Sequence, residues 1–260
     1  WLSEQVTDLS RLLEVTPAQL IIDAHPGYET ADPAFRSQFG ALPVTRIYHH
    51  HAHILSAMAE NNLMDRPLLG ISCDGTGYGP DGTIWGCELL RVSPAEPSAK
   101  RVAHLEQFRL PGGEKAVHET DRLAISAAHT ANIELDLLPF EAERITQIRF
   151  LLERAINAPL TSSAGRLFDA VSALLGLCIT ATYEGRGAIL LQQAAEQCDA
   201  VKAPPYPVAI TRGEPDTLTF SPMLHALLGD PAPIPERALK FHHWFARTLF
   251  EAALPYAEGE

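Results

Sequence analysis

The chain has 260 residues, 46% of them hydrophobic, which is enough to bury one or two sizeable cores. Its formal net charge of −12 argues against a nucleic-acid-binding surface, because phosphate backbones select Lys and Arg. No apolar run reaches the length of a transmembrane helix. Four widely spaced cysteines without a Cys-x-x-Cys pair indicate reduced thiols in a cytoplasmic protein, not a disulfide framework.

Hydrophobic periodicity and turn residues predict the elements of the first half of the chain. In chain order these are an amphipathic helix over 1–19, strands at 20–22 and 44–48, a helix from about His50 to Asn61, and a hairpin of strands at 68–73 and 83–90.

The second half is predicted to be mainly helical. We expect a surface turn at 94–100, helices over 116–196 broken by loops at 157–163 and 180–187, a β-prone stretch at 203–215, a strand and turn at 220–224, and a linker at 230–235 before a last helix from about Glu236. The apolar stripe of the helix near 164–176 is expected to be core.

Four of the eleven histidines fall within five positions of the predicted second helix: His49, His50, His51 and His53. On a helix, His49 and His53 lie one turn apart on the same face. Two imidazoles at that spacing can hold one divalent metal ion. The alternative is a cluster of partly buried histidines with a structural role.

The predicted strands are joined by a tight glycine-rich turn over 74–82, which begins with Asp74-Gly75-Thr76-Gly77 and also contains Asp81. Glycine lets backbone N–H groups approach an anion closely, and an aspartate at the strand end can hold a metal that bridges phosphates. The alternative is an ordinary hairpin turn. We therefore predict that Asp74 joins His49 and His53 at a metal site beside a phosphate site.

These residues resemble the carbamoyltransferases of [NiFe]-hydrogenase maturation, the HypF family. The motif His-His-His-Ala-His at 49–53 is followed by the family's hairpin sequence at 74–86, and three further stretches agree in order. These stretches are Asp23–Tyr28, Leu110–Ala116, and Ser162–Gly176 with Tyr183–Gly185. The resemblance spans about 20–250.

The resemblance implies an α/β actin/sugar-kinase-like (ASKHA) fold, with two related lobes around a nucleotide cleft and helical insertions. On this basis 1–95 is expected to form the first lobe, with the histidine helix and the hairpin, and 96–260 a mostly helical second part with an incomplete second lobe. The family's first phosphate strand would precede Trp1, and its second glycine-rich loop and last metal-binding acid would follow Glu260. The chain is therefore expected to be an internal part of a longer protein that does not complete the reaction alone.

The resemblance also implies a function. Such domains bind ATP or carbamoyl-adenylate with a divalent metal, of iron, zinc or magnesium type, and transfer the carbamoyl group to the C-terminal cysteine of the partner HypE. The resulting thiocarboxamide becomes a cyanide ligand of the hydrogenase. By position, His49, His53 and Asp74 match metal ligands, and Asp169, Glu184 and Gly185 match the nucleoside-binding region.

Other roles follow less directly from the motif. His50 and His51 are expected to act in catalysis, one as a donor or acid at the carbamoyl group and the other supporting the metal site. Gly75, Thr76 and Gly77 are expected to contact the nucleotide. A non-catalytic module that binds metal or nucleotide and docks a partner remains an alternative, as does a relative of the tRNA threonylcarbamoyl transferases. A metal-dependent hydrolase is disfavoured, because no acid lies between His49 and His53.

Overall fold

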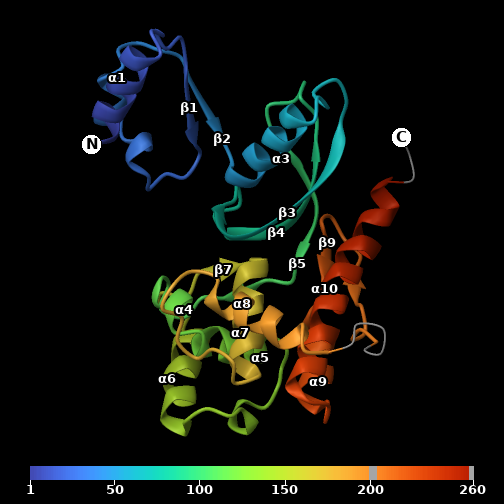
Figure 1. Cartoon of the computed structure of the whole chain (residues 1–260). Coiled ribbons are helices and arrows are strands. Elements are labelled where there is room, and N and C mark those ends of the chain that lie inside the picture. Colours follow the sequence, from blue (N-terminus) through green and yellow to red (C-terminus); the bar gives the residue numbers. More distant parts are fainter. Residues whose placement is uncertain (199–203, 258–260) are drawn as a thin grey trace.

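The computed structural model describes residues 1–198 and 204–257, which form an α/β structure (Figure 1). Ala203, the first residue of the predicted β-prone stretch, lies outside the described residues. Within the described part, no helix is both long and apolar enough to cross a lipid bilayer.

The N-terminal segment forms a small unit around two parallel strands, drawn in blue in Figure 1. Its elements are α1 (Leu2–Leu12), β1 (Leu20–Asp23), η1 (Glu29–Ala31), α2 (Pro33–Ser37) and β2 (Val44–Ile47). β1 and β2 pair in parallel from Leu20 opposite Val44 to Asp23 opposite Ile47. The helix predicted over 1–19 ends early, because Glu14 adopts a left-handed φ of 54° that a helix cannot continue.

Among the described residues, seven strands form a second, mixed sheet. They are β3 (Leu68–Tyr78), β4 (Ile84–Val92), β5 (Lys100–Leu105), β6 (Phe108–Arg109), β7 (Leu160–Thr161), β8 (Ile210–Thr211) and β9 (Asp216–Leu218). Their order is β6-β7-β4-β5-β9-β8, with β3 paired on β4. The antiparallel β3–β4 pair confirms the predicted hairpin. β4 also pairs with β5 across the predicted lobe boundary at residue 95, and the two-lobe division itself stays a prediction.

The predicted glycine-rich turn is confirmed at Gly79–Gly82, where the Gly82 N–H donates to the Gly79 carbonyl oxygen, but its extension over Asp74–Gly77 is wrong. These residues belong to β3, and the strand pairing ends only at Tyr78 opposite Ile84. The register shifts between Cys73 and Gly77, so the glycines form an irregularity inside the strand. Glycine is typical both of turns and of places where neighbouring groups approach the backbone closely. At Asp74–Gly77 the glycines allow such a close approach.

The remaining elements are helical and mostly follow the prediction. They are α3 (His49–Glu60), α4 (Lys115–His118), α5 (Asp121–Thr130), η2 (Leu135–Leu137), α6 (Ala142–Glu153), α7 (Ala164–Leu174), α8 (Arg186–Ala195), α9 (Ser221–Gly229) and α10 (Ile234–Ala257). The strand predicted at 220–224 is wrong, since α9 begins there. Proline is tolerated in the first turn of a helix, where Pro222 lies, and Met223, Leu224 and Leu227 form the buried face of α9.

Two hydrophobic clusters hold these layers together. The larger lies between the sheet and the helices and includes the α7 residues Leu167, Val171 and Leu174, which confirms the predicted core stripe. The smaller lies under α3, where Ile54 and Met58 pack on strand β4. Full burial of one such side chain stabilises a fold by roughly 1.5–3 kcal/mol. This packing fixes the hairpin β3–β4 between α3 and the helical part (Figure 1).

Candidate metal and nucleotide site

The helix α3 brings two imidazoles to one aspartate of β3. Because α3 begins at His49, His49 and His53 share a face one turn apart. The Nε2 atom of His49 lies 2.9 Å from Oδ2 of Asp74, and the two histidine Nε2 atoms lie 3.0 Å apart. Nε2 of His53 lies 3.8 Å from the same aspartate oxygen. Three donor atoms from two elements therefore converge on one point.

The chemistry of these three donors fits a divalent metal ion. Their ligand atoms all lie within 4.8 Å of one another. Two ring nitrogens facing each other at 3.0 Å require at least one to be unprotonated, and imidazole with carboxylate is a ligand set for zinc or iron. Burial acts to raise the pKa of Asp74, but hydrogen bonds from the Gly75 N–H and from His49 outweigh it, so this pKa lies below its ordinary value.

A second carboxylate, that of Asp23, lies on the side of His49 that faces away from Asp74. Its Oδ2 lies 3.7 Å from Nδ1 of His49, the nitrogen that faces away from Asp74. Its Oδ1 accepts a hydrogen bond from the backbone N–H of His25 at 2.7 Å, and the His25 ring stacks on Tyr28 with centroids 4.3 Å apart. Asp23 is the first residue of the motif stretch Asp23–Tyr28, but no role was predicted for it. Its position at the end of β1 was the available signal.

The predicted catalytic histidines, His50 and His51, are both buried. His50 lies against the site, with Nε2 4.0 Å from Oδ2 of Asp74, and its two ring nitrogens have no hydrogen-bond partner within the described residues. Burial lowers the pKa of His50 and of His51. No contact described for His51 joins it to Asp74. The catalytic roles of these histidines stay predictions.

The irregular part of β3 is fitted closely between α3 and α7. A Cβ atom at Gly77 would lie 2.4 Å from Cε1 of His50, so only glycine leaves room for the histidine helix. On the other side, Ser163 caps α7 by accepting a hydrogen bond from the Arg166 N–H at 3.1 Å. The Ser163 hydroxyl donates to the carbonyl oxygens of Asp74 and Gly75, each 2.8 Å away. The strand is thus held from both sides.

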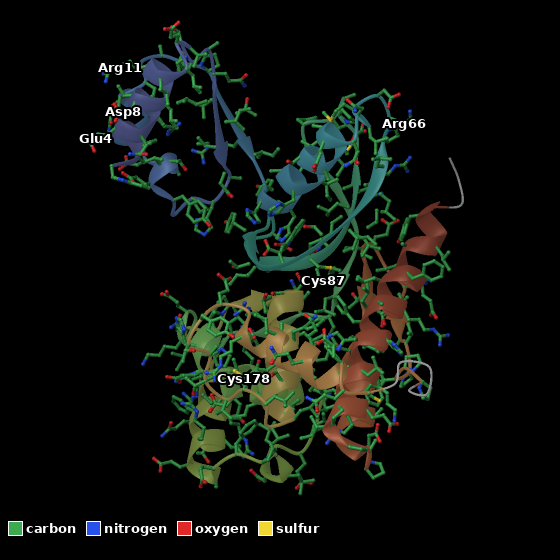
Figure 2. The ribbon with its side chains drawn as sticks, in the orientation of Figure 1. Glu4, Asp8, Arg11, Arg66, Cys87 and Cys178 are labelled. Carbon is green, nitrogen blue, oxygen red and sulfur yellow. The ribbon has the colours of Figure 1, made fainter. Side chains whose placement is uncertain are left out.

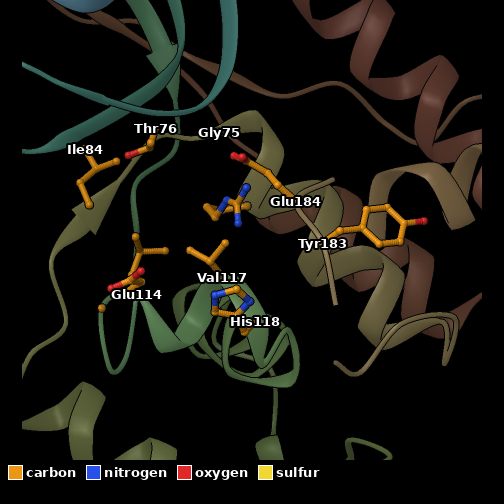
Figure 3. Close-up of a pocket in the computed structure, with 11 residues that line it drawn as sticks. Gly75, Thr76, Ile84, Glu114, Val117, His118, Tyr183 and Glu184 are labelled. Atoms are coloured by element: carbon orange, nitrogen blue, oxygen red, sulfur yellow. The ribbon is translucent and has the colours of Figure 1, made fainter. Parts of the chain in front are cut away.

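A cavity of about 410 Å³ opens beside the metal candidate (Figure 3). Thr76 and Ile84 line one wall, Val117 and His118 the opposite wall, and Glu184 extends toward it from the side. The full lining is Gly75, Thr76, Ile84, Leu110, Gly113, Glu114, Val117, His118, Arg166, Tyr183 and Glu184. A mainly apolar cavity with a few charged groups is the usual form of a small-molecule site.

Behind this cavity lies a buried ion pair. Nη1 of Arg166 lies 3.0 Å from Oδ2 of Asp169, and both side chains are almost fully buried. Burial raises the pKa of Asp169 to about 6, against the opposing effect of Arg166 and with a further increase from Glu184. Gly187 fits tightly here, because a Cβ atom on it would lie 2.5 Å from Oδ1 of Asp169.

The predicted nucleotide residues therefore fall into separate places. Gly75, Thr76 and Glu184 line the cavity. Asp169 is buried beside Arg166, and Gly185 directly precedes α8 (Arg186–Ala195) with a left-handed φ of 77°. Gly77 packs on His50, and Asp74 belongs with the metal candidates. The binding roles of all of these residues stay predictions.

Several cavity residues were not singled out by the sequence analysis. Glu114, Val117 and His118 come from the loop and helix after β6, and Arg166 comes from the start of α7. Glu114 and Arg166 stand inside the motif stretches quoted above, which was the available signal. For Val117 and His118 the sequence offered no signal, because only the fold brings α4 opposite β3.

Models of known protein families match nearly the whole chain. Residues 70–260 match the model described as "Carbamoyltransferase, Kae1-like Domain, second subdomain". Residues 1–60 match the model described as "HypF Kae1-like domain".

Individual relatives agree with this assignment. Carbamoyltransferase HypF of Synechocystis sp. is 34% identical over 274 residues, which cover 96% of this chain and 34% of that protein. Carbamoyltransferase HypF2 of Cupriavidus necator is 38% identical over 214 residues, 80% of this chain and 26% of that protein. This chain thus spans about a third or less of the length of these curated relatives.

Solved structures give the same result. The crystal structure of full-length HypF in its phosphate- and nucleotide-bound form superposes with a TM-score of 0.86 at 30% identity, covering 97% of this chain and 39% of that one. HypF of T. kodakarensis superposes with a TM-score of 0.83 at 27% identity, covering 98% of this chain and 35% of that one. The chain therefore belongs to the HypF carbamoyltransferase family and corresponds to its Kae1-like domain.

Proposed function

We propose that this chain is the carbamoyl-transfer part of a hydrogenase-maturation carbamoyltransferase with an ASKHA-type fold. In this proposal it binds ATP or carbamoyl-adenylate, with the nucleoside in the 410 Å³ cavity and the phosphate side at a divalent metal on His49, His53 and Asp74. The observation that carries the proposal is the adjacency of Asp74 and Gly75 on β3. One belongs to the metal candidates and the other lines the cavity.

The chemistry asked of these residues is positioning and charge neutralisation. A divalent ion on the three donors would offset the phosphate charge of the adenylate. Gly75 offers unhindered backbone beside the cavity, and the Arg166 guanidinium places positive charge on its wall. The cysteine thiolate of HypE then attacks the carbamoyl carbon, a C–S bond forms, the C–O bond to phosphate breaks, and AMP leaves.

His50 is suited to a supporting role in this reaction. It is fully buried next to Asp74, and burial keeps it neutral near pH 7 by lowering its pKa. A neutral imidazole with unpartnered nitrogens can donate one hydrogen bond and accept another. We assign it the contact with the carbamoyl or phosphate oxygen as a donor, and His51 the support of the helix behind it.

Isothermal titration of ATP into zinc-loaded protein tests this proposal, with metal content measured alongside. We expect wild type to bind both, and His49→Ala/His53→Ala to lose zinc and most nucleotide affinity. His129→Ala, an exposed histidine at the end of α5, serves as the control and should match wild type. Unchanged ATP binding in the double variant would contradict a metal-linked phosphate site. Zinc binding without any nucleotide binding would favour a partner-docking module.

A further inference from the structure

We propose that Cys73 and Cys87 form an oxidisable dithiol, which a peroxide converts into a disulfide across strands β3 and β4. The two residues are direct partners in the antiparallel register, so their side chains lie on the same face of the sheet. Nothing in the proposed transfer reaction uses either sulfur.

The backbone at this pair can supply the movement that a disulfide needs. Cβ atoms of directly opposed residues lie roughly 4.5–5.5 Å apart, whereas a disulfide needs roughly 3.5–4.5 Å. The shift in strand register begins at Cys73 and extends to Gly77. Cys73 therefore borders an irregular segment in which a small displacement does not break a regular ladder.

The two thiols differ in their access to an oxidant. Cys73 is exposed, whereas Cys87 is completely buried in the main core cluster, where Figure 2 labels it on the sheet. A peroxide in solution therefore meets Cys73 first. The other buried cysteine, Cys178, has its thiol directed to the carbonyl oxygen of Thr180 at 3.6 Å, so Cys87 is the partner in position to resolve an oxidised Cys73.

The reaction balances with one molecule of peroxide. The Cys73 sulfur attacks the O–O bond, one oxygen leaves as water, and Cys73 becomes a sulfenic acid. The Cys87 sulfur then attacks the Cys73 sulfur, an S–S bond forms, and the hydroxyl leaves with the thiol proton as a second water. Two thiols are oxidised to one disulfide, and hydrogen peroxide is reduced to two waters.

Closure of this disulfide has a consequence for the neighbouring residue. Asp74 follows Cys73 directly, and its carboxylate lies 2.9 Å from His49. Drawing Cys73 toward β4 displaces the backbone that carries Asp74, so we expect weaker metal binding in the oxidised protein. This consequence rests on the function proposed above, whereas disulfide formation does not.

Peptide mass spectrometry tests the dithiol. The reduced full chain is treated with hydrogen peroxide, alkylated under denaturing conditions and digested. We expect a Cys73–Cys87 cross-linked peptide as the main oxidation product in wild type and in Cys178→Ser. Cys87→Ser should instead accumulate sulfenic acid at Cys73, trapped by dimedone. Recovery of both thiols fully alkylated after excess peroxide, or direct over-oxidation of Cys73 without a cross-link, would overturn the inference.

Zinc titration of the same samples, after removal of peroxide, tests the consequence separately. We expect at least a severalfold loss of zinc affinity on oxidation of wild type and no change in Cys73→Ser/Cys87→Ser. A cross-link that leaves zinc affinity unchanged would refute the effect on Asp74 and leave the dithiol supported. If the reduced protein binds no zinc, the proposed metal site fails, and the cross-link is judged on its own result.

Discussion

The buried carboxyl group of Asp169 makes the stability of the folded protein depend on pH. The residue is only 2% exposed, and burial raises its pKa to about 6 although Arg166 opposes the shift. The folded protein therefore holds this proton more tightly than the unfolded chain, in which aspartate has a pKa near 3.9. The resulting stability is complete below about pH 4 and is lost as the pH rises through about 6.

This linkage predicts the behaviour of Asp169→Asn, whose side chain cannot ionise. Wild type should lose stability between pH 4 and pH 7 that the variant keeps. The difference in free energy of unfolding, variant minus wild type, should therefore grow by about 3 kcal/mol over this range, the energy of a pKa shift of about two units. Urea unfolding of both proteins across this pH range measures the difference. Parallel pH profiles would show that Asp169 is ionised in the folded state throughout, with Arg166 controlling its pKa.

At the scale of elements, the site depends on how closely β3 approaches α3. Gly77 gives the clearest case, because a Cβ atom there would lie 2.4 Å from His50 and 2.9 Å from His49. His50 is 1% exposed and lies between Gly77 and Trp85, so it has little room to move aside. Overpacking at such a position costs roughly 1–3 kcal/mol.

We therefore expect Gly77→Ala to lower the free energy of unfolding by about 1–3 kcal/mol and to weaken metal binding by moving the histidine helix away from Asp74. Gly229→Ala is the matched control, because no atom lies within 4 Å of the added methyl group there. Urea unfolding and zinc titration of the two variants make the comparison. Equal stability of both variants would mean that the strand adjusts without affecting α3.

The same elements show what the sequence could and could not predict. The proximity of His49 and His53 follows from helical spacing, which is a local property. The place of Asp74–Gly77 within β3 did not follow, since glycine marks both turns and close packing. Val117, His118 and Arg166 reach the cavity only because α4 and α7 pack opposite β3, and such contacts between distant segments have no periodic signal in the sequence.

At the scale of the whole molecule, the N-terminal unit places a carboxylate beside the candidate metal site. Asp23 ends β1, and its Oδ2 lies 3.7 Å from Nδ1 of His49. A metal-binding histidine commonly directs its second ring N–H to a carboxylate, which fixes the ring and raises its basicity, and loss of this partner typically costs 10- to 100-fold in metal affinity. The small parallel sheet thus places a carboxylate behind a candidate metal ligand that belongs to α3.

Asp23→Asn tests this link between the N-terminal unit and the metal site. Asparagine keeps an oxygen that can accept the His25 N–H but removes the negative charge beside His49. We expect zinc affinity to fall roughly 10-fold or more, because the His49 ring loses the carboxylate that faces its second nitrogen. Asp32→Asn is the control, since Asp32 caps α2 in the same unit and asparagine caps equally well. Equal zinc affinity in both variants would show that the N-terminal unit packs beside the site without tuning it, and that His49 is oriented by α3 and Asp74 alone.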